Sequence, residues 1–320
     1  MILFNLHIFE DQIVNADEAV DWLRKSQDDE VILDIGNEGP SLTQCGLIEL
    51  VQASGKDFKQ VQINTPNQYE ILPFKFSNPV PWYLPWFSSC RTASLKYKVS
   101  DILGQHYRLG CFIGRKNLDR LSILYWISRR HTVFLSSLRD DHIKCEQRPD
   151  IAQWVDNVFS FNNWVTNFNI PSVDNFTVED QYGERDKDGN HNNMLEVQLN
   201  MLRYYSQFDV ELVCETFVRG ETFFPTEKTV RPIMGEKPFL MYGPKNYLAN
   251  LRNLGFQTWE TCWDESYDQY EGIERWERMK QVIDQISFWG EWEWKPIIQK
   301  ANEIAKHNYQ HYIKSVPVVR

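Results

Sequence analysis

The sequence predicts an α/β fold built from two Rossmann-like domains that face each other across a cleft. Short apolar runs alternate with helical patterns in two blocks, as in parallel-sheet proteins. The chain of 320 residues is also longer than one compact core usually needs. A proline- and aromatic-rich stretch, "FSNPVPWYLPWFSSC" at 76–90, separates the blocks. We expect an N-terminal domain over 1–100, a second domain over 101–295, and a C-terminal helix in 296–320 that packs back on the first domain.

The first block carries a strand–helix–strand unit. "VILDI" at 31–35 is a short apolar run that ends in the loop "GNEGP", which is typical of a buried strand. Ser41 can cap a helix in "LTQCGLIELVQA" at 42–53, and "KQVQIN" at 59–64 alternates like a strand. A helical crossover joins strands that run in the same direction, so this unit predicts a parallel sheet.

The second block repeats this alternation over a longer stretch. Apolar runs predict strands at 109–114, 131–137, 210–216 and 237–243. Helical patterns predict helices at 115–130, from Pro225 onward, at 246–255, at 271–287 and at 296–313. The helix at 246–255 has Asn246 as its expected N-cap and Gly255 at its C-terminal end.

Composition narrows the class of protein. The 34 basic and 44 acidic side chains give a formal charge of −10, which disfavours a general nucleic-acid binder. The six cysteines have no CxxC spacing, so reduced thiols fit better than a disulfide framework or a zinc knuckle. "MILFNLHIFEDQIV" lacks the basic start of a signal peptide, and no run approaches the roughly 20 apolar residues of a membrane span. These features predict a cytoplasmic protein.

One short stretch, "ETFFPTEKTVR" at 221–231, places Glu227 beside Lys228 at the start of an expected helix. Ligands of open α/β sheets bind where a strand ends and the next helix begins. Helix-start N–H groups attract phosphate, Pro225 suits a first turn, and Lys228 would add positive charge. Glu227 can accept hydrogen bonds from a ribose, and Glu215 approaches from the preceding strand. A solvated helix start fits the same residues, and the pattern alone leaves both interpretations open.

The longer segment "VELVCETFVRGETFFPTEKTVRPIMGEKPFLMYGP" at 210–244 resembles the C-terminal donor-binding domain of GT-B glycosyltransferases of the α1,3-fucosyltransferase type. It looks most like glycosyltransferase-like proteins of bacteriophages and marine bacteria, which share "TEKTVRP" and the "LGF…WDESYD" run at 254–268. The resemblance covers 205–285 well, 105–135 loosely and the first hundred residues hardly at all. It implies a GT-B fold in a bacterial or phage-infected cytoplasm. It also implies a donor site in which Thr226 contributes, Glu227 holds the ribose and Lys228 holds the diphosphate.

Two further residues complete the expected site. The fucosyltransferase pattern has a basic residue in the first loop of the donor domain, where "FIGRKNLDRL" places Arg115 as a phosphate clamp. Arg120 is expected on the surface of the helix that follows. In the N-terminal domain, Glu38 of "DIGNEGP" lies between two glycines, where a carboxylate can take the acceptor hydroxyl proton. Asp34 is the next candidate base. Solvated loop positions fit Arg115 and Glu38 as well.

Metal ligands are not expected. "DKD" at 186–188 matches the Asp-x-Asp motif of GT-A glycosyltransferases, but it lies in the most polar stretch of the chain. "RDDH" at 139–142 has no third ligand at a recognised spacing.

Asp264 and Glu265 of "CWDESYD" could meet donor hydroxyls or cap a helix.

The sequence therefore predicts a metal-independent, inverting glycosyltransferase with a nucleotide diphosphate sugar as donor, a saccharide as acceptor and no cofactor. A second interpretation replaces the saccharide with a hydroxymethylated DNA base of a phage. The cluster at 129–131 and the aromatic run at 81–87 would then supply phosphate contacts and stacking, although the net charge speaks against it. A third interpretation is a non-catalytic binding or structural module with a glycosyltransferase-like fold.

Overall fold

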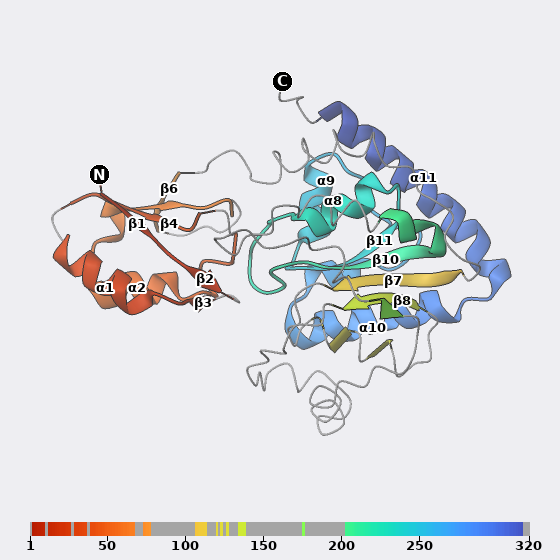
Figure 1. The fold of residues 1–320 in the computed structure, drawn as a ribbon, viewed down its shortest axis with the longest axis horizontal. Coiled ribbons are helices and arrows are strands. Elements are labelled where there is room, and N and C mark those ends of the chain that lie inside the picture. Colours follow the sequence, from red (N-terminus) through yellow and green to blue (C-terminus); the bar gives the residue numbers. More distant parts are fainter. Residues whose placement is uncertain are drawn as a thin grey trace.

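A computed structural model gives the structure of residues 2–9, 12–26, 29–36, 39–67, 73–77, 106–113, 134–138, 175–176 and 202–315, together with Arg120, Ser122, Ile123, Trp126 and Ile127. Over these residues the chain has a mixed α/β fold with two parallel sheets and a small hairpin (Figure 1). The apolar side chains gather in two clusters, one around each sheet. The predicted α/β class with parallel sheets is confirmed.

The first sheet has the strand order β1-β4-β5-β6 and is parallel throughout. Its strands are β1 (Ile2–Asn5), β4 (Val31–Asp34), β5 (Val61–Asn64) and β6 (Lys75–Ser77), and the hairpin joins β2 (Ile8–Phe9) to β3 (Gln12–Ile13). The helices α1 (Ala16–Lys25) and α2 (Leu47–Ser54) cover one face, and η1 (Phe58–Gln60) precedes β5. Burial alternates along β4 and β5, because successive side chains point to opposite faces. The predicted parallel unit is therefore present.

The helix predicted from Ser41 begins later than expected. Ser41 closes a turn instead, since its carbonyl accepts the Cys45 N–H at 3.0 Å and its Oγ accepts the Gln44 N–H at 3.4 Å. α2 starts only after Gly46, whose φ of 80° is a left-handed conformation. The glycine separates the turn from the helix, so Ser41 does not cap α2.

The second sheet has the strand order β11-β10-β7-β8-β9, and its neighbouring strands are also parallel. Its strands are β7 (Tyr107–Ile113), β8 (Phe134–Leu138), β9 (Asn175–Phe176), β10 (Phe208–Cys214) and β11 (Phe239–Tyr242). Its helices are η3 (Leu202–Gln207), α8 (Glu227–Met234), α9 (Tyr247–Asn253), η4 (Ser266–Gln269), α10 (Gly272–Phe288) and α11 (Glu291–Ser315). Each strand predicted in the second block overlaps an observed strand.

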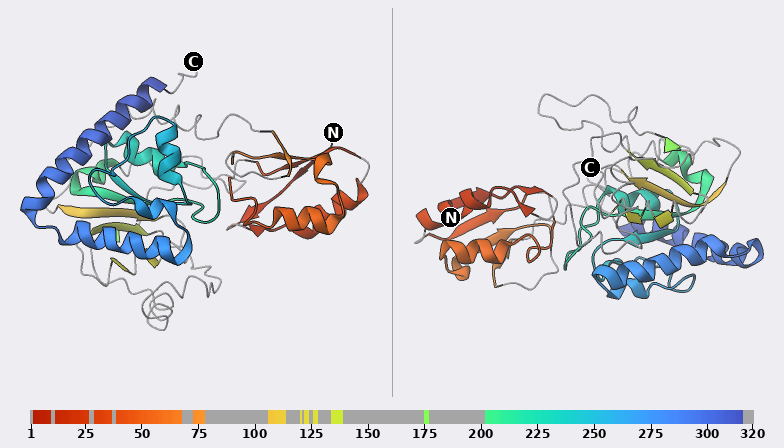
Figure 2. Two further views of the ribbon diagram at one scale, coloured as in Figure 1. Left: turned by 180° about the vertical axis from the view of Figure 1, so that it is seen from behind. Right: turned by 90° about the horizontal axis from the view of Figure 1, so that it is seen from below.

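Helical layers cover both faces of the second sheet, which is why β10 and β11 are buried along most of their length (Figure 2). Phe239 packs edge-on against Trp259 with ring centroids 4.4 Å apart, and the Trp259 indole N–H donates to the Ala301 carbonyl of α11 at 3.1 Å. Tyr242, three residues after Phe239 in β11, packs against Trp276 of α10 with ring centroids 5.9 Å apart. Side chains three apart on a strand face opposite sides, so α10 and α11 belong to different layers.

The C-terminal helix packs on the second sheet over its described length, not on the first as expected. α11 buries Trp294, Ala301, Ile304 and Tyr312 in the apolar cluster of the second sheet. Figure 1 shows α11 on the side of the molecule away from the first sheet. The expected brace is therefore wrong for the described part of this helix, because its apolar side chains complete the core of the second sheet. The boundaries near 100 and 295 remain predictions.

The N-terminus of α9 is capped by a residue distant in sequence. Asn246 takes the expected N-cap position, with a φ of 62°, but its side chain makes no capping bond. The carboxylate of Asp268 accepts the N–H groups of Leu248 and Ala249 instead, each at 3.0 Å. Gly255 lies just past the helix with a φ of 89°, as expected for a C-terminal glycine. α9 therefore depends on the segment around η4 for its first turn.

Replacing Asp268 should test this dependence. In Asp268→Asn one acceptor oxygen becomes an amide NH₂, which cannot accept an N–H of α9, and the buried ion pair of Asp268 with Arg275 at 3.7 Å is lost as well. We expect the free energy of unfolding, measured by urea denaturation, to fall by about 1–3 kcal/mol. Asp264→Asn is the matched control, because Asp264 is exposed and accepts its hydrogen bonds from Ser266 of the neighbouring turn, so it should lose less than about 1 kcal/mol. Equal losses in the two variants would contradict the capping role.

Candidate functional site

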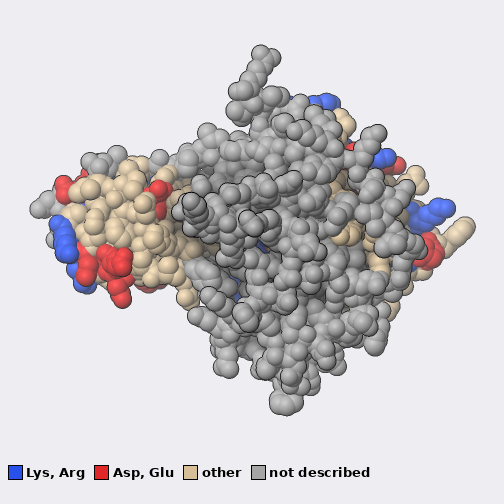
Figure 3. Space-filling view, viewed as in Figure 1, with Lys and Arg blue, Asp and Glu red and all other residues tan. Residues whose placement is uncertain are grey.

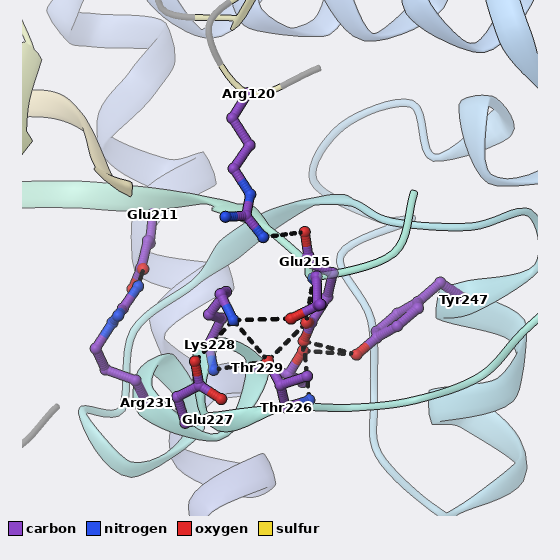
Figure 4. Close-up of polar contacts among 10 residues, drawn as sticks. Arg120, Glu211, Glu215, Thr226, Glu227, Lys228, Thr229, Arg231 and Tyr247 are labelled. Atoms are coloured by element: carbon purple, nitrogen blue, oxygen red, sulfur yellow. Dashed lines mark hydrogen bonds and ion pairs between the residues drawn. The ribbon is translucent and has the colours of Figure 1, made fainter. Parts of the chain in front are cut away.

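The Glu215 side chain connects the elements at the carboxyl edge of the second sheet (Figure 4). Glu215 directly follows β10, is 1% exposed, and its carboxylate accepts five hydrogen bonds. The donors are the backbone N–H groups of Thr216 (3.0 Å) and Thr226 (3.1 Å) and the hydroxyls of Thr226 (2.6 Å), Thr229 and Tyr247 (3.1 Å). A buried carboxylate is tolerated only when its oxygens are paired in this way. Glu215 thus ties α8 and α9 to the end of β10.

Thr226 links this anchor to α8. It is the N-cap of the helix, and its hydroxyl donates to Glu215 at 2.6 Å while accepting the Lys228 N–H at 3.3 Å. The first helical residue is Glu227, two residues after Pro225, which we expected in the first turn. The start is shifted because a threonine side chain supplies the capping oxygen that proline lacks.

Glu227 and Lys228 lie side by side in the first turn of α8, as the sequence predicted. The Lys228 ammonium donates to Glu227 Oε1 at 2.7 Å, and to the Thr216 and Thr226 hydroxyls at 3.0 and 3.3 Å. The Lys228 and Glu227 side chains are 16% and 8% exposed. Burial is the largest single influence and raises the pKa of Glu227. The charge of Lys228, the hydrogen bonds to the carboxylate and the charge of Arg231 together outweigh burial and hold the pKa below its ordinary value. The two residues therefore form an ion pair with a small solvent-accessible part.

Three backbone N–H groups at the start of α8 bond within the protein. The Thr226 N–H donates to Glu215 at 3.1 Å, the Lys228 N–H to the Thr226 hydroxyl at 3.3 Å, and the Thr229 N–H to the Thr226 carbonyl at 3.1 Å. We expected these groups to attract phosphate, but their hydrogen bonds are already made. An anion at this edge would therefore be attracted mainly by the charge of Lys228 and less by the N–H groups at the start of α8.

A second anchor, which the sequence analysis missed, holds the middle of α8. Arg231 donates from Nη2 to Glu211 of β10 and from Nε to the Tyr205 hydroxyl at 3.1 Å, and that hydroxyl donates to Glu211. The Arg231 and Glu211 side chains are 3% and 0% exposed. Burial acts to lower the pKa of Arg231, but the charge of Glu211, the Tyr205 hydroxyl and the hydrogen bonds to both together outweigh it and hold the pKa above its ordinary value. Because breaking one member of a buried pair is costly, this contact keeps α8 fixed on the sheet.

Arg120 reaches the same edge from the helical segment after β7. It is 4% exposed, and its Nη2 donates to the Glu215 carbonyl at 2.9 Å. Our expectation of a surface arginine is wrong, because Arg120 shares one helical face with the buried Ile123 and Ile127. That spacing of three and seven residues is the signal in the sequence that could have placed it. The structure thus brings a second cation beside Glu215.

The other expected site residues have different outcomes. Asp34 ends β4, and its Oδ1 accepts the Gly36 N–H at 3.0 Å and the Asn64 amide at 2.7 Å. Those that lie outside the described residues are Glu38, Arg115, Asp186, Asp188, and the segments 81–87, 129–131 and 139–142. In the part of the chain that the structure describes, no three His, Cys, Asp or Glu side chains gather as metal ligands. Metal independence remains a prediction.

Asp264 and Glu265 bond within the protein. Glu265 accepts the Trp259 N–H at 2.7 Å and pairs with Arg252 at 3.2 Å, and its side chain is 5% exposed. Burial raises the pKa of Glu265 to about 7, although hydrogen bonds from Thr258 and Trp259 and the charge of Arg252 oppose the rise. Asp264 is exposed and accepts hydrogen bonds from the turn that follows it. Neither carboxylate lies with the Glu227–Lys228 pair, so we assign both to the fold.

Charged side chains of both signs mix on the face drawn in Figure 3. The patch over α1 combines Asp17, Glu18 and Asp21 with Arg24 and Lys25, and Arg24 pairs with Asp21 at 3.3 Å. The described surface on this face therefore shows mixed charge and not a continuous basic stripe. No helix within the described ranges is both long enough and apolar enough to cross a bilayer.

Comparisons of the chain with protein-family models, with curated proteins and with solved structures give no match.

The pKa of Glu265 makes stability depend on pH. Its folded-state pKa of about 7 lies above the ordinary unfolded value near 4.3, so the folded chain holds this proton more tightly. The stabilisation is present below about pH 4.3 and is lost as pH rises through about 7. Glu265→Gln removes the titrating group. We expect the parent to lose on the order of 3 kcal/mol of unfolding free energy relative to this variant between pH 4 and about pH 8.

Urea denaturation across a pH series measures this difference. Glu260→Gln is the matched control, because Glu260 is an exposed glutamate in the same segment. Its pH profile should follow that of the parent. Parallel profiles for the parent and Glu265→Gln would show that the buried carboxyl does not titrate as described.

Proposed function

We propose that the protein is a glycosyltransferase that moves a sugar from a nucleotide diphosphate sugar to a saccharide acceptor without a metal ion. The observation that carries this proposal is the Glu227–Lys228 ion pair in the first turn of α8, at the carboxyl edge of a parallel sheet. Open α/β sheets bind their ligands at this edge. The resemblance of 210–244 to the donor domain of GT-B glycosyltransferases points to the same two residues.

In this proposal Lys228 and Arg120 stabilise the departing diphosphate. Both cations lie beside Glu215. The Lys228 ammonium donates to the hydroxyls of Thr216 at 3.0 Å and Thr226 at 3.3 Å, which belong to the residues that bond the Glu215 carboxylate. Arg120 donates to the Glu215 carbonyl at 2.9 Å. Positive charge held where the leaving group becomes negative lowers the barrier, as a metal ion does in GT-A enzymes. Glu227 accepts hydrogen bonds from the donor ribose. Arg115 remains a predicted second clamp.

The acceptor would bind against the first sheet, in a two-domain GT-B arrangement. Glu38, in the loop after β4, would take the proton from the acceptor hydroxyl as that oxygen attacks the anomeric carbon. The diphosphate leaves from the opposite face of the sugar, so configuration inverts. Asp34 is the alternative base, held at the end of β4 by Gly36 and Asn64.

One observation favours a second candidate, a non-catalytic module with a glycosyltransferase-like fold. All three N–H donors of the Lys228 ammonium have acceptors within the protein. A phosphate must therefore displace at least one of these bonds, and the same cluster would serve if its role were only structural. A thermal-shift panel of uridine, guanosine, cytidine and thymidine diphosphate sugars separates the candidates. Saturating donor raises stability by about 2.7 kcal/mol at a hundredfold excess over Kd, whereas a structural module shows no shift.

Lys228→Ala tests the donor site. Loss of a charge-assisted contact to the diphosphate should weaken donor binding by roughly 1.5–3 kcal/mol, which is about 10- to 150-fold in Kd. Titration calorimetry with the donor found in the panel measures it. Lys306→Ala, an exposed lysine on α11, is the matched control and should bind as the parent does. If both variants bind equally well, the diphosphate does not lie at Lys228.

Glu38→Gln tests the catalytic base. The variant keeps the size and polarity of the side chain but cannot take a proton. Donor affinity should hardly change, while turnover falls about 10²–10⁴-fold. Product stereochemistry is the independent check, since this mechanism inverts the anomeric carbon. Retention of configuration, or turnover close to that of the parent, would remove Glu38 from the mechanism and make Asp34 the residue to change next.

A further inference from the structure

The loop of residues 216–226, which we call the bridging loop, joins β10 to α8 and has both ends in the proposed donor site. At its first residue, the Thr216 hydroxyl accepts a hydrogen bond from the Lys228 ammonium at 3.0 Å. At its last residue, the Thr226 hydroxyl accepts from the same ammonium at 3.3 Å. Lys228 therefore bridges the two ends of the loop.

The middle of the bridging loop contacts the first sheet. The Thr222 hydroxyl donates to the Gly39 carbonyl at 2.5 Å. The Asn67 amide donates to the Pro40 carbonyl at 2.9 Å and to the Glu221 carbonyl at 3.3 Å, so it joins both sides. Residues 39–40 follow β4 and Asn67 follows β5, which places these contacts at the carboxyl edge of the first sheet. The two parallel sheets thus meet through this loop, which extends from β10 toward the first sheet in Figures 1 and 2.

Glycines allow a close approach on both sides of this contact. A Cβ on Gly39 would lie 2.6 Å from the Phe224 ring, and a Cβ on Gly220 would lie 2.4 Å from the Ser41 hydroxyl. Gly220 also has a φ of 67°, which residues with a side chain rarely adopt. Packing this tight leaves the loop little freedom to shift without moving the segment at 39–44.

We propose that the bridging loop couples ligand binding at Lys228 to the position of the first sheet. An anion at Lys228 must displace at least one of the three bonds of the ammonium, and two of these three, to the hydroxyls of Thr216 and Thr226, hold the ends of the loop. A change at either end is passed to Gly39 and Ser41 through the packed middle. This inference rests on the proposed donor site, and it gives that site a means of positioning the acceptor side.

Coupling of this kind is reciprocal. If anion binding stabilises the contact with the first sheet, loss of the contact must weaken anion binding by the same factor. A purely structural loop would lack this effect. Substitutions in such a loop would change the stability of the protein but not the affinity of an anion for the unchanged Lys228 site. The informative measurement is therefore the affinity of an anion for Lys228 in variants whose substitution lies at the contact with the first sheet.

The test compares Gly220→Ala with Gly272→Ala. The two glycines have φ values of 67° and 55°, so alanine introduces similar backbone strain at each. Only at Gly220 does the added Cβ meet the first sheet, because nothing lies within 4 Å of the Cβ position at Gly272. Thr222→Val is a milder variant that removes the hydrogen bond to Gly39 and keeps the side-chain shape. Inorganic pyrophosphate is the probe, with binding measured by calorimetry and amide hydrogen exchange followed over 39–46.

We expect pyrophosphate to slow exchange over 39–46 in the parent and in Gly272→Ala. It should bind at least about fivefold more weakly to Gly220→Ala and Thr222→Val than to these two proteins. Equal affinity in all four proteins, with no change in exchange over 39–46, would overturn the coupling while leaving the donor site in place. If pyrophosphate fails to bind the parent, or binds Lys228→Ala as tightly as the parent, the proposed donor site and the coupling both fail.

Discussion

The buried carboxylate of Glu215 is the interaction on which the carboxyl edge of the second sheet depends. Five donors from four residues converge on it, and they belong to the bridging loop, to α8 and to the first residue of α9. Hydrogen bonds to a charged acceptor are stronger than neutral ones, and the low-dielectric interior makes an unpaired carboxylate costly. The chain can therefore bury Glu215 only by bringing these elements together, which places Glu227 and Lys228 at the rim.

This anchor acts together with the Glu211–Arg231 pair. Glu211 and Glu215 lie four residues apart at and just beyond β10, and they hold the middle and the start of α8 respectively. A helix held at two places presents Lys228 in a fixed direction. In the proposed function, this fixed direction would leave less reorganisation to be made when negative charge arrives, although one of the internal bonds of Lys228 must still be displaced. The internal bonds of Lys228 are then the cost of holding the charge ready.

The sequence predicted the elements of the site better than its contacts. The strand before the site and a helix that begins near Glu227 and Lys228 follow from an apolar run and from Pro225, which are local signals. The burial of Arg120 follows from its spacing to Ile123 and Ile127, but its partner, the Glu215 carbonyl, lies 95 residues away along the chain and has no local signal. The cap of α9 was assigned to Asn246 for the same reason, since Asp268 lies 20 residues beyond Leu248. Glu38 and Arg115 remain predictions, because the described residues do not include them.

The distant cap of α9 bears on how the chain is built during synthesis. When residues 247–253 leave the ribosome, the carboxylate that completes their first turn has not yet emerged. A helix of seven residues is too short to be stable alone in water, so it has to await Asp268 and the packing of η4. Since Tyr247 at the head of this helix donates to Glu215, the carboxyl edge of the second sheet is finished only after residue 268 has emerged.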